Sequence, residues 1–339
     1  MASASGRDGR AQRAFVVIGL VAILLAALLS GAWYYLARQL DARAASAIEE
    51  AAARGVSVDC PQREVFGYPF RLGLRCAAFG LDVPGETLRL TGGALRTAAQ
   101  IYRPNRVVGE LDGPVVVTRA DAPPVTLTWS LAQASSTFWT QGVDHFALVL
   151  DGLSVGAGEP GAGVSPLAES ARVEAHGRRR EADLDLALSA LQLRALVPAA
   201  AGLPAADTAL DVTIAGAADW LGGAAAGRSI PELMAGRSGT LRAMRIDLGA
   251  SDADLSGPFE VSPEGEISGR LQLAVTDPAA VAGTVAAAVP ALAGVANAVA
   301  SAISFAGREV DGRRVVDLTL DEGRLSAGFL PLGRIPPLR

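Results

Sequence analysis

The sequence predicts an α+β fold rich in β-structure: an extended, curved antiparallel sheet with a few packed helices, preceded by one N-terminal transmembrane helix. Gly (38) and Pro (19) together make about a sixth of the 339 residues, which fits many turns between short strands. Short runs of alternating apolar and polar residues recur after residue 55, as half-buried strands require. A single long uncharged, Leu-rich run lies near the N-terminus.

The composition narrows the classes of function. Half of the residues are hydrophobic, whereas 5% are aromatic and 19% are charged, so disorder caused by low hydrophobicity is excluded. All 30 basic residues are Arg, and with 35 acidic residues the net charge is -5, which favours no nucleic-acid partner. Two His and two Cys supply few metal ligands or nucleophiles, and we expect no cofactor.

The uncharged run from Ala14 to Leu36 predicts a transmembrane anchor over residues 14–36. It spans roughly 35 Å as a helix, enough to cross a hydrocarbon core. Arginines precede it within residues 1–13, and the aromatic trio Trp33, Tyr34 and Tyr35 lies at its far end, matching the positive-inside rule and an interfacial aromatic belt. We therefore expect a cytoplasmic basic tail in residues 1–13, a single-pass anchor in the inner (cytoplasmic) membrane, and a periplasmic location for the bulk of the chain.

The alternative to an anchor is a cleaved signal peptide, in which Ser30 and Ala32 occupy the small positions before a cut at Trp33. The apolar run is longer than a usual signal core of about 7 to 15 residues, which favours the anchor. Residues 37–54 are Ala-rich, place Leu40, Ala44 and Ile48 on one stripe and end at Gly55, so they predict a helical stalk that extends the anchor.

Cys60 and Cys76 are the two cysteines of the chain. In an exported, oxidising setting we expect them to form a disulfide rather than a metal pair or redox thiols. Between them lies a turn motif that separates two strand-like runs, residues 56–60 and 71–76, and its residues are Gly67, Tyr68, Pro69, Phe70 and Arg71. The pattern predicts a hairpin of these two runs, fastened by the disulfide.

These residues resemble an uncharacterised bacterial family, domain-of-unknown-function family 2125. The matching features are Cys60, Gly67 to Arg71, Cys76, residues 99–105 (AQIYRPN), residues 109–114 (GELDGP) and residues 331–338 (PLGRIPPL). The resemblance implies a membrane-anchored exported protein with no assigned activity and no catalytic residues to carry over. A looser likeness of pattern to AsmA-like envelope proteins implies a long curved sheet of the kind thought to hold lipid.

Two β-rich halves, residues 55–170 and 171–339, are predicted from the alternating runs. The runs are 86–90, 106–111, 115–119, 125–129 and 146–150 in the first half, and 184–188, 210–214, 244–248, 259–261, 267–275, 315–320 and 324–330 in the second. The turn Ser262-Pro263-Glu264-Gly265 predicts a hairpin of 259–261 with 267–275. Helices are predicted around residues 218–221 and 231–235.

Residues 278–306 are uncharged and dominated by Ala, with Pro290 in the middle. A second membrane helix is disfavoured because Ala and Gly contribute far less to membrane insertion than the Leu-rich anchor does. We expect two short helices around Pro290, which pack on the sheet and whose thin face could line or cap an apolar groove.

Several short motifs contain residue types that serve in catalysis or ligand binding. Gly152-Leu153-Ser154-Val155-Gly156 matches a nucleophile elbow, with His176 as the only His downstream, but a Gly-rich loop follows where the elbow needs a helix. The same loop lacks the helix that a dinucleotide-binding Gly156-x-Gly158-x-x-Gly161 motif requires. Residues 178–180 (RRR) predict a solvated hairpin tip. The functional alternative is contact with anionic lipid head groups or polysaccharide.

The remaining charged candidates favour structural roles. Asp183 with Asp185, and likewise Asp252 with Asp254, alternate along strand-like runs and predict wet sheet faces rather than catalytic pairs. Arg71 is expected to bind a neighbouring acid, with a lipid head group as the alternative.

We therefore expect a membrane-anchored protein that binds lipid or another envelope amphiphile in a groove of its sheet. The alternative function is a non-catalytic scaffold of an envelope assembly, whose exposed sheet edges recruit protein partners. No catalytic constellation emerges, so we expect no enzyme, with a hydrolase at Ser154 as the exception. The expected partners are the membrane, a lipid or amphiphile, and envelope proteins, without nucleic acid.

Overall fold

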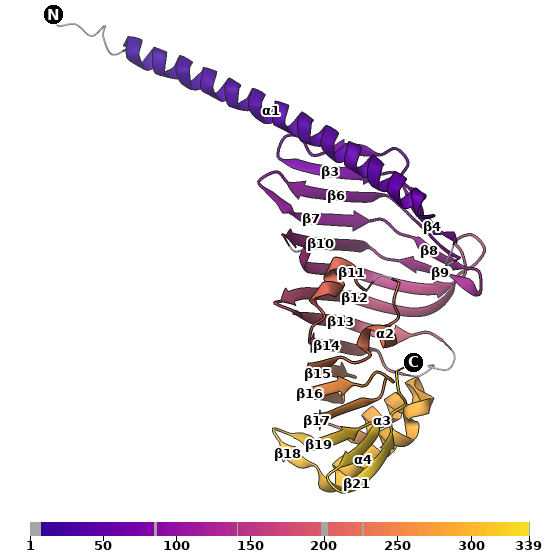
Figure 1. The fold of residues 1–339 in the computed structure, drawn as a ribbon. Helices are drawn as coiled ribbons and strands as arrows, with labels where there is room; N and C mark the ends of the chain where they lie inside the picture. The colour runs from indigo at the N-terminus through magenta and orange to yellow at the C-terminus, as the bar shows by residue number, and fades with distance from the viewer. Residues whose placement is uncertain (1–7, 85–86, 141, 198–202, 226, 339) are drawn as a thin grey trace, which may run out of the picture.

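The protein is a long N-terminal helix followed by one large antiparallel sheet that carries a few short helices (Figure 1). The computed structural model describes residues 8–84, 87–140, 142–197, 203–225 and 227–338. The predicted fold class is confirmed. Residues 1–7 of the predicted tail and Glu86 of a predicted strand lie outside the described residues.

Helix α1 runs unbroken from Asp8 to Ala53, so the predicted anchor and stalk form a single helix. One part of it, within Arg13–Ala53, is long and apolar enough to cross a membrane. The C-terminal part of α1 contacts the first three strands. Residues 37–53 are therefore packed against the sheet and are not a free spacer.

The strands become longer toward the middle of the chain, from 3 residues in β1 to 16 in β11. The first eleven are β1 (Ser57–Asp59), β2 (Glu64–Phe66), β3 (Arg71–Cys76), β4 (Phe79–Val83), β5 (Leu88–Gly92), β6 (Leu95–Gln100), β7 (Arg103–Leu111), β8 (Val115–Arg119), β9 (Ala122–Thr128), β10 (Leu131–Trp139) and β11 (Gly142–Ala157).

The remaining strands and the short helices follow β11, and the predicted boundary between the halves at residues 170 and 171 falls inside β12. The strands are β12 (Ser165–Arg180), β13 (Asp183–Ala195), β14 (Ala206–Ile214), β15 (Ser238–Asp247), β16 (Asp252–Val261), β17 (Ile267–Val275), β18 (Arg308–Val310), β19 (Arg313–Asp321), β20 (Arg324–Ala327) and β21 (Leu330–Arg334). The helices are η3 (Ala218–Gly222), α2 (Ile230–Met234), α3 (Pro278–Ala288), η4 (Pro290–Leu292) and α4 (Ala293–Ala306). The predicted pair of helices around Pro290 is confirmed.

Strand β11 is the branch point of the sheet. Along one edge it pairs with β10 from Gly142 to Asp151 and with β9 from Ser154 to Ala157. From β10 one arm continues through β7, β6, β3 and β2. From β9 a second arm continues through β8, β5, β4 and β1. The sheet therefore forks toward the end that carries α1.

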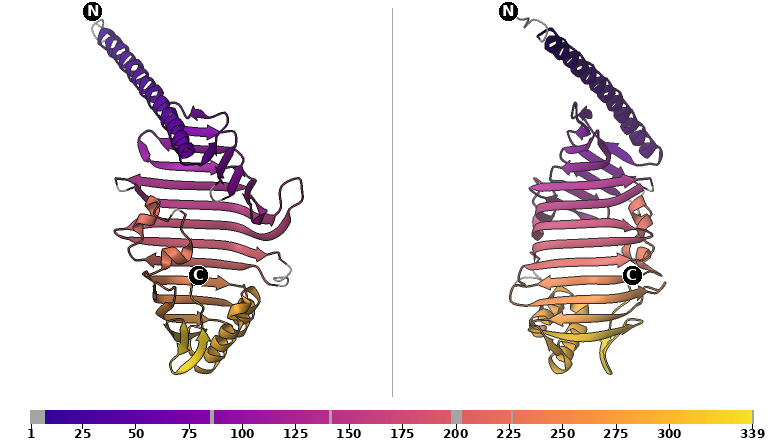
Figure 2. Two further views of the ribbon diagram at one scale, coloured as in Figure 1. Left: turned by 45° about the vertical axis from the view of Figure 1, so that its right-hand side comes forward. Right: turned by 90° about the vertical axis from the view of Figure 1, so that its left-hand side faces the viewer.

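On its other edge β11 begins a simple meander from β12 to β17, whose strands are stacked along the length of the molecule in Figure 2. Strand β19 pairs with β17, and β20 and β21 complete this end. The predicted hairpin of β16 and β17 is confirmed by the register Val261 to Ile267. Pro331 lies in β21, which pairs only with β20 among the described strands, so this proline occupies an edge strand.

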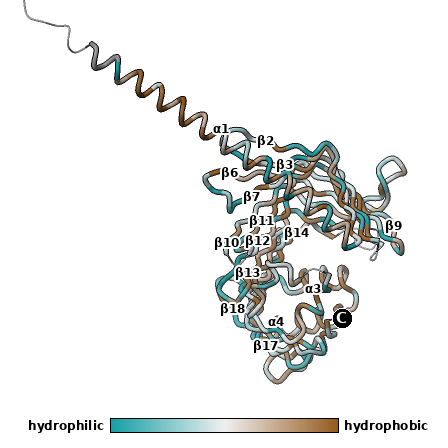
Figure 3. The backbone as a smooth tube through the Cα atoms, turned by 45° about the horizontal axis from the view of Figure 1, so that its top comes forward, coloured by the Kyte–Doolittle hydropathy of each residue, from teal (hydrophilic) through white to brown (hydrophobic). Residues whose placement is uncertain are grey.

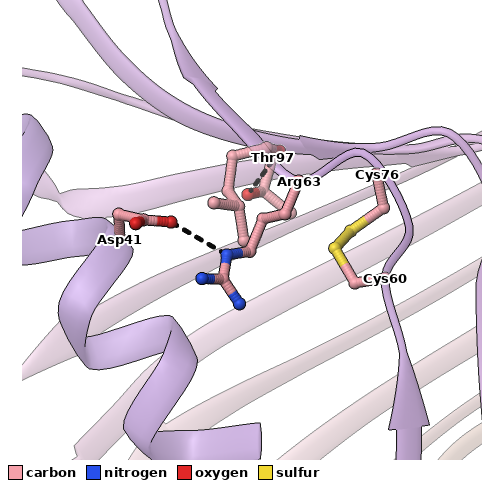
Figure 4. Close-up of a disulfide and its surroundings, with 6 residues drawn as sticks. Asp41, Cys60, Arg63, Cys76 and Thr97 are labelled. Carbon is pink, nitrogen blue, oxygen red and sulfur yellow. Dashed lines mark hydrogen bonds and ion pairs between the residues drawn. A yellow bond between two sulfur atoms is a disulfide. The ribbon is translucent and has the colours of Figure 1, made fainter.

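Cys60 and Cys76 form a disulfide with a Cα–Cα distance of 5.0 Å (Figure 4). The hairpin that we predicted between residues 56–60 and 71–76 is wrong, because β1 pairs with β4 while β3 pairs with β2 and β6. The three-residue strand β2 takes the place beside β3, directly across the turn. The disulfide therefore joins the end of β1, the last strand of one arm, to β3, the strand next to the last in the other arm, instead of fastening one hairpin.

Apolar side chains of successive strands line up in one row across the sheet, which we call the apolar row. Each member lies directly opposite the next, and cross-strand partners share a face of the sheet. The row consists of Leu148, Ala175, Leu188, Leu210, Met244, Leu255, Leu273 and Val316.

Two short helical covers form the buried core of the second half. Ala302 and Ile303 of α4 pack with Val275, Val316 and other strand residues. The connection that contains η3 and α2 forms a second cluster, in which Trp220 and Met234 pack against Leu184, Val212 and Ile214. Both covers lie on the face that carries the apolar row, since Leu255 and Leu273 belong to the first cluster and Leu210 to the second.

Candidate functional site

An apolar cavity of about 680 Å³ lies between the sheet and the helices α3 and α4. Its floor is the middle of the apolar row, from Leu188 to Leu273, and its other wall is formed by Val281, Val299 and Ile303 of the two helices. The volume falls within the roughly 300–1,000 Å³ of small-molecule and cofactor sites. The Ala-rich segment thus lines a groove, one of the two roles expected for it.

The cavity is open where the apolar row leaves the cover of the helices. Leu188 is 46% exposed and Met244 is 54% exposed, although both lie on the sheet face that buries Val275 and Val316. Exposed neighbouring apolar side chains of this size are costly in water unless a ligand or partner covers them. The opening therefore has the chemistry of a site for a hydrocarbon group.

The same face continues from the cavity toward α1. Beyond Leu148 the register passes through Ala134, Gly109, Thr97, Leu74 and Val65. A parallel line beside it consists of Phe146, Ser136, Val107, Ala99 and Leu72. None of these side chains carries a charge, so an uncharged strip connects the cavity to the strands that α1 contacts.

The opposite face of the sheet carries charged networks. Asp185 of β13 is 7% exposed and accepts hydrogen bonds from Thr213 (2.8 Å), Arg242 (2.9 Å) and Arg178 (3.1 Å). Arg242 also binds Asp211. We predicted a wet face for Asp185, and this is wrong, because flanking side chains of β12, β14 and β15 cover it.

The pKa of Asp185 reflects two opposing causes. Burial alone raises it, but the hydrogen bonds from Thr213, Arg242 and Arg178 favour the charged form and together lower the pKa to about 2. The pKa of Arg242 is raised, first because of its hydrogen bond to Asp211 and also because of its hydrogen bond to Asp185. The cluster is a satisfied structural network, and Asp185 stays ionised near neutral pH.

The Gly67 to Arg71 turn motif docks on the end of the apolar part of α1. The indole Nε1 of Trp33 donates to the backbone oxygen of Arg71 at 2.7 Å, and Trp33 is 7% exposed. The Tyr68 ring meets the Trp33 ring edge-on at a centroid distance of 5.5 Å, and its hydroxyl lies 2.8 Å from the Ser30 hydroxyl. The motif therefore fixes the sheet to the helix.

A second contact lies farther along α1, beside the disulfide. Arg63 donates to Asp41 at 2.8 Å, and Figure 4 shows this pair next to the Cys60–Cys76 bridge. Ala37, between the two contacts, is 8% exposed. Sheet and helix are thus joined over several turns of α1, so the angle between them is set by packing.

The catalytic candidates are not brought together. Ser154 lies within β11 opposite Glu169, and His176 lies in β12 opposite Ala147. Ala147 and Ser154 are seven positions apart along β11, which corresponds to roughly 23 Å. His176 is instead 3.6 Å from Glu174. Neither the elbow nor the dinucleotide motif is followed by a helix, because the chain leads through a loop into β12.

The remaining motifs take structural places. Residues 178–180 end β12 at a hairpin tip, where Arg178 and Arg180 pair with acids of β13. Asp254 binds Arg245 and Asp252 binds Arg313. Within the described ranges, no group of three or more His, Cys, Asp or Glu side chains could hold a metal ion.

Sequence reasoning missed the alignment of the apolar row and the docking of Trp33. The alternation of each strand was visible, but the partner of each strand was not. For Trp33, one signal was present, because the indole N–H of a buried Trp needs an acceptor. The structure supplies it as the backbone oxygen of Arg71. Figure 3 shows how the strongly apolar stretch of α1 projects away from the sheet.

The sequence of the chain matches the profile of a bacterial family over residues 33–336, and this family is described as an uncharacterized protein conserved in bacteria, DUF2125. The chain belongs to the DUF2125 family. The match begins at Trp33, so the family region includes the helix residue that holds the turn motif, together with the whole sheet. The expected family is confirmed, while the looser AsmA likeness stays a prediction. No curated protein matches the chain.

Proposed function

We propose that this DUF2125 protein binds an amphiphile with at least one long hydrocarbon chain and holds that chain against the apolar row and within the cavity. The observation that carries the proposal is the unbroken alignment of uncharged side chains from the cavity to the strands beside α1. A pure scaffold would need a filled core along this face, but around Leu188 and Met244 the described residues leave the apolar row exposed.

The location is part of the proposal. Helix α1 anchors the chain in the inner membrane, with the N-terminus in the cytoplasm and the sheet in the periplasm. The disulfide between Cys60 and Cys76 supports an oxidising compartment, and the Arg residues before the apolar run support the orientation. An amphiphile that leaves the outer leaflet would meet the uncharged strip at its α1 end. The proposed role is binding, without catalysis.

The test is native mass spectrometry and lipid extraction of the detergent-purified full chain. We expect a co-purified amphiphile at a stoichiometry near one per chain, which a detergent-only control does not contain. An empty protein that also fails to take up added phospholipid would refute the proposal.

A scaffold of an envelope assembly is the second candidate. The observation that favours it is a pair of exposed aromatic side chains at the C-terminal end of the sheet, Phe305 (91% exposed) and Phe329 (fully exposed). Crosslinking followed by pull-down distinguishes the two functions. A stoichiometric protein partner together with an empty cavity would favour the scaffold.

A further inference from the structure

Two adjacent turns at the α1 end of the sheet carry exposed aromatic side chains. Tyr68 (55% exposed) and Phe70 (62%) belong to the β2–β3 turn, and Tyr102 (68%) belongs to the β6–β7 turn. The two turns are adjacent, because the N–H of Ile101 donates to the backbone oxygen of Phe70 at 3.1 Å. Together they form one aromatic rim, which we define as Tyr68, Phe70 and Tyr102.

The contact with α1 gives the depth of this rim relative to a membrane. The Tyr68 hydroxyl lies 2.8 Å from the Ser30 hydroxyl. The first charged residue after the apolar run is Arg38, eight positions later, or roughly 12 Å along the helix axis. If α1 spans the bilayer, the rim is level with the last turns of the apolar segment, which is the depth of the interfacial aromatic belt.

Arginines stand beside the aromatic rim. Arg71, Arg103 and Arg106 are exposed and line a hollow of about 420 Å³ together with Arg96. Arg96 is bound to Asp112 and Glu110, whereas the other three form no ion pair in the described part of the chain. The acid that we expected for Arg71 is therefore not found there, and the hollow has an excess of unpaired positive charge.

We propose that the aromatic rim and the three unpaired arginines seat the sheet on the bilayer surface, with Arg71, Arg103 and Arg106 binding the phosphates of anionic phospholipids. The aromatic rings occupy the head-group level, and the guanidinium groups supply the planar donors that phosphate oxygens accept. The surface lies against the end of the anchor, so the tether already holds it at the membrane. This inference rests on α1 as a membrane anchor and does not require the cavity to bind a ligand.

The test uses a nitroxide label on the full chain in vesicles. Both native cysteines are in the disulfide, so Tyr102→Cys adds a single free thiol. Val310→Cys, in β18 at the other end of the sheet, is the matched control because it is 47% exposed. We expect lipid-soluble oxygen to relax the label at 102 and a water-soluble nickel chelate to relax the label at 310. Equal access of the nickel chelate to both labels would overturn the proposal.

The arginines are tested by lipid composition. Vesicles of phosphatidylcholine are compared with vesicles that also contain phosphatidylglycerol. Each basic residue near an anionic surface shifts the binding equilibrium by roughly fivefold. Replacing Arg71, Arg103 and Arg106 by Gln should thus lower the ratio of docked to undocked label at position 102 by at least roughly tenfold on the anionic vesicles.

A control removes the same charge elsewhere by replacing Arg119, Arg179 and Arg270 with Gln, and we expect it to keep the docked ratio. A ratio that does not depend on phosphatidylglycerol, or that falls equally in the control, would overturn the phosphate contact. Amphiphile extraction from the Arg71, Arg103 and Arg106 variant separates this inference from the proposed function. The cavity is not changed by these substitutions, so the variant should still contain the bound amphiphile even when it no longer docks.

Discussion

Introducing charge at the mouth of the cavity should remove amphiphile binding without unfolding the protein. The perturbation is the double substitution Leu188→Glu and Met244→Glu. These two side chains lie on either side of Leu210 in the apolar row, and they are 46% and 54% exposed. Both are large members of the apolar row that the protein leaves uncovered, and a bound hydrocarbon chain would cover them.

The magnitude follows from the exposed fractions, which together equal about one whole side chain. Full burial of a Leu or Met side chain is worth about 1.5–3 kcal/mol. A ligand that covers both residues gains this free energy, and its loss corresponds to roughly 10- to 150-fold in Kd. Two carboxylates beneath the ligand add a desolvation penalty, so a roughly 10-fold increase in Kd is the smallest effect that we expect.

The assay is a fluorescence titration of the full chain with a dansyl-labelled fatty acid in detergent below its micelle concentration. Val310→Glu is the control, because it places one such carboxylate on a side chain of similar exposure (47%) that does not line the cavity. We expect the unfolding midpoint of both variants to stay close to that of the unmodified protein, since exposed substitutions change stability by about 0.5 kcal/mol. An unchanged Kd in the double variant would refute the placement of the ligand.

Three further predictions concern stability. Asp185→Asn should lower the free energy of unfolding at neutral pH by about 2 kcal/mol, because folding lowers the pKa of Asp185 to about 2. This contribution is present above about pH 4 and is lost as the pH falls through 2. Urea titrations at several pH values should therefore show the two proteins converging in acid, and a constant difference would contradict this. Replacing both Cys60 and Cys76 by Ser opens a loop with a sequence separation of 16 and should cost about 3 kcal/mol, seen as a lower urea midpoint that no longer responds to reductant. Ile303 is 1% exposed between α4 and the sheet, so Ile303→Ala should lower the free energy of unfolding by about 2–5 kcal/mol. Phe305 on the same helix is 91% exposed, so Phe305→Ala should change this free energy by about 0.5 kcal/mol at most. Equal losses in the two variants would show that α4 does not pack on the sheet through Ile303.

Much of the local structure could be predicted from short patterns. The uncharged run predicted the apolar part of α1, Pro290 predicted the break between α3 and α4, and the Ser262 to Gly265 turn predicted the β16–β17 hairpin. Each of these signals lies within a few residues of the structure that it determines. The two cysteines likewise predicted their own bond, since no other partner was available in the chain.

Predictions that needed a partner strand were less successful. The assignment of residues 56–60 to a hairpin with β3 was wrong, because the alternation of a strand says which side chains share a face but not which strand lies beside it. Asp185 fits a wet face by its own alternation, yet three other strands place Thr213, Arg178 and Arg242 around it. The candidate site depends on the same long-range information.

The sequence by itself determined the elements of this protein: an apolar helix, short alternating strands, two Ala-rich helices and a disulfide. It did so because hydrophobic periodicity, turn residues and charge act over a few neighbouring positions. Only the tertiary structure decided that the sheet forks at β11, that the apolar side chains of eight strands form one row, and that Trp33 and Tyr68 lock the anchor to the sheet. These features arise from the register between strands that are far apart in the chain, and register is set by the combined packing of many side chains rather than by any single segment.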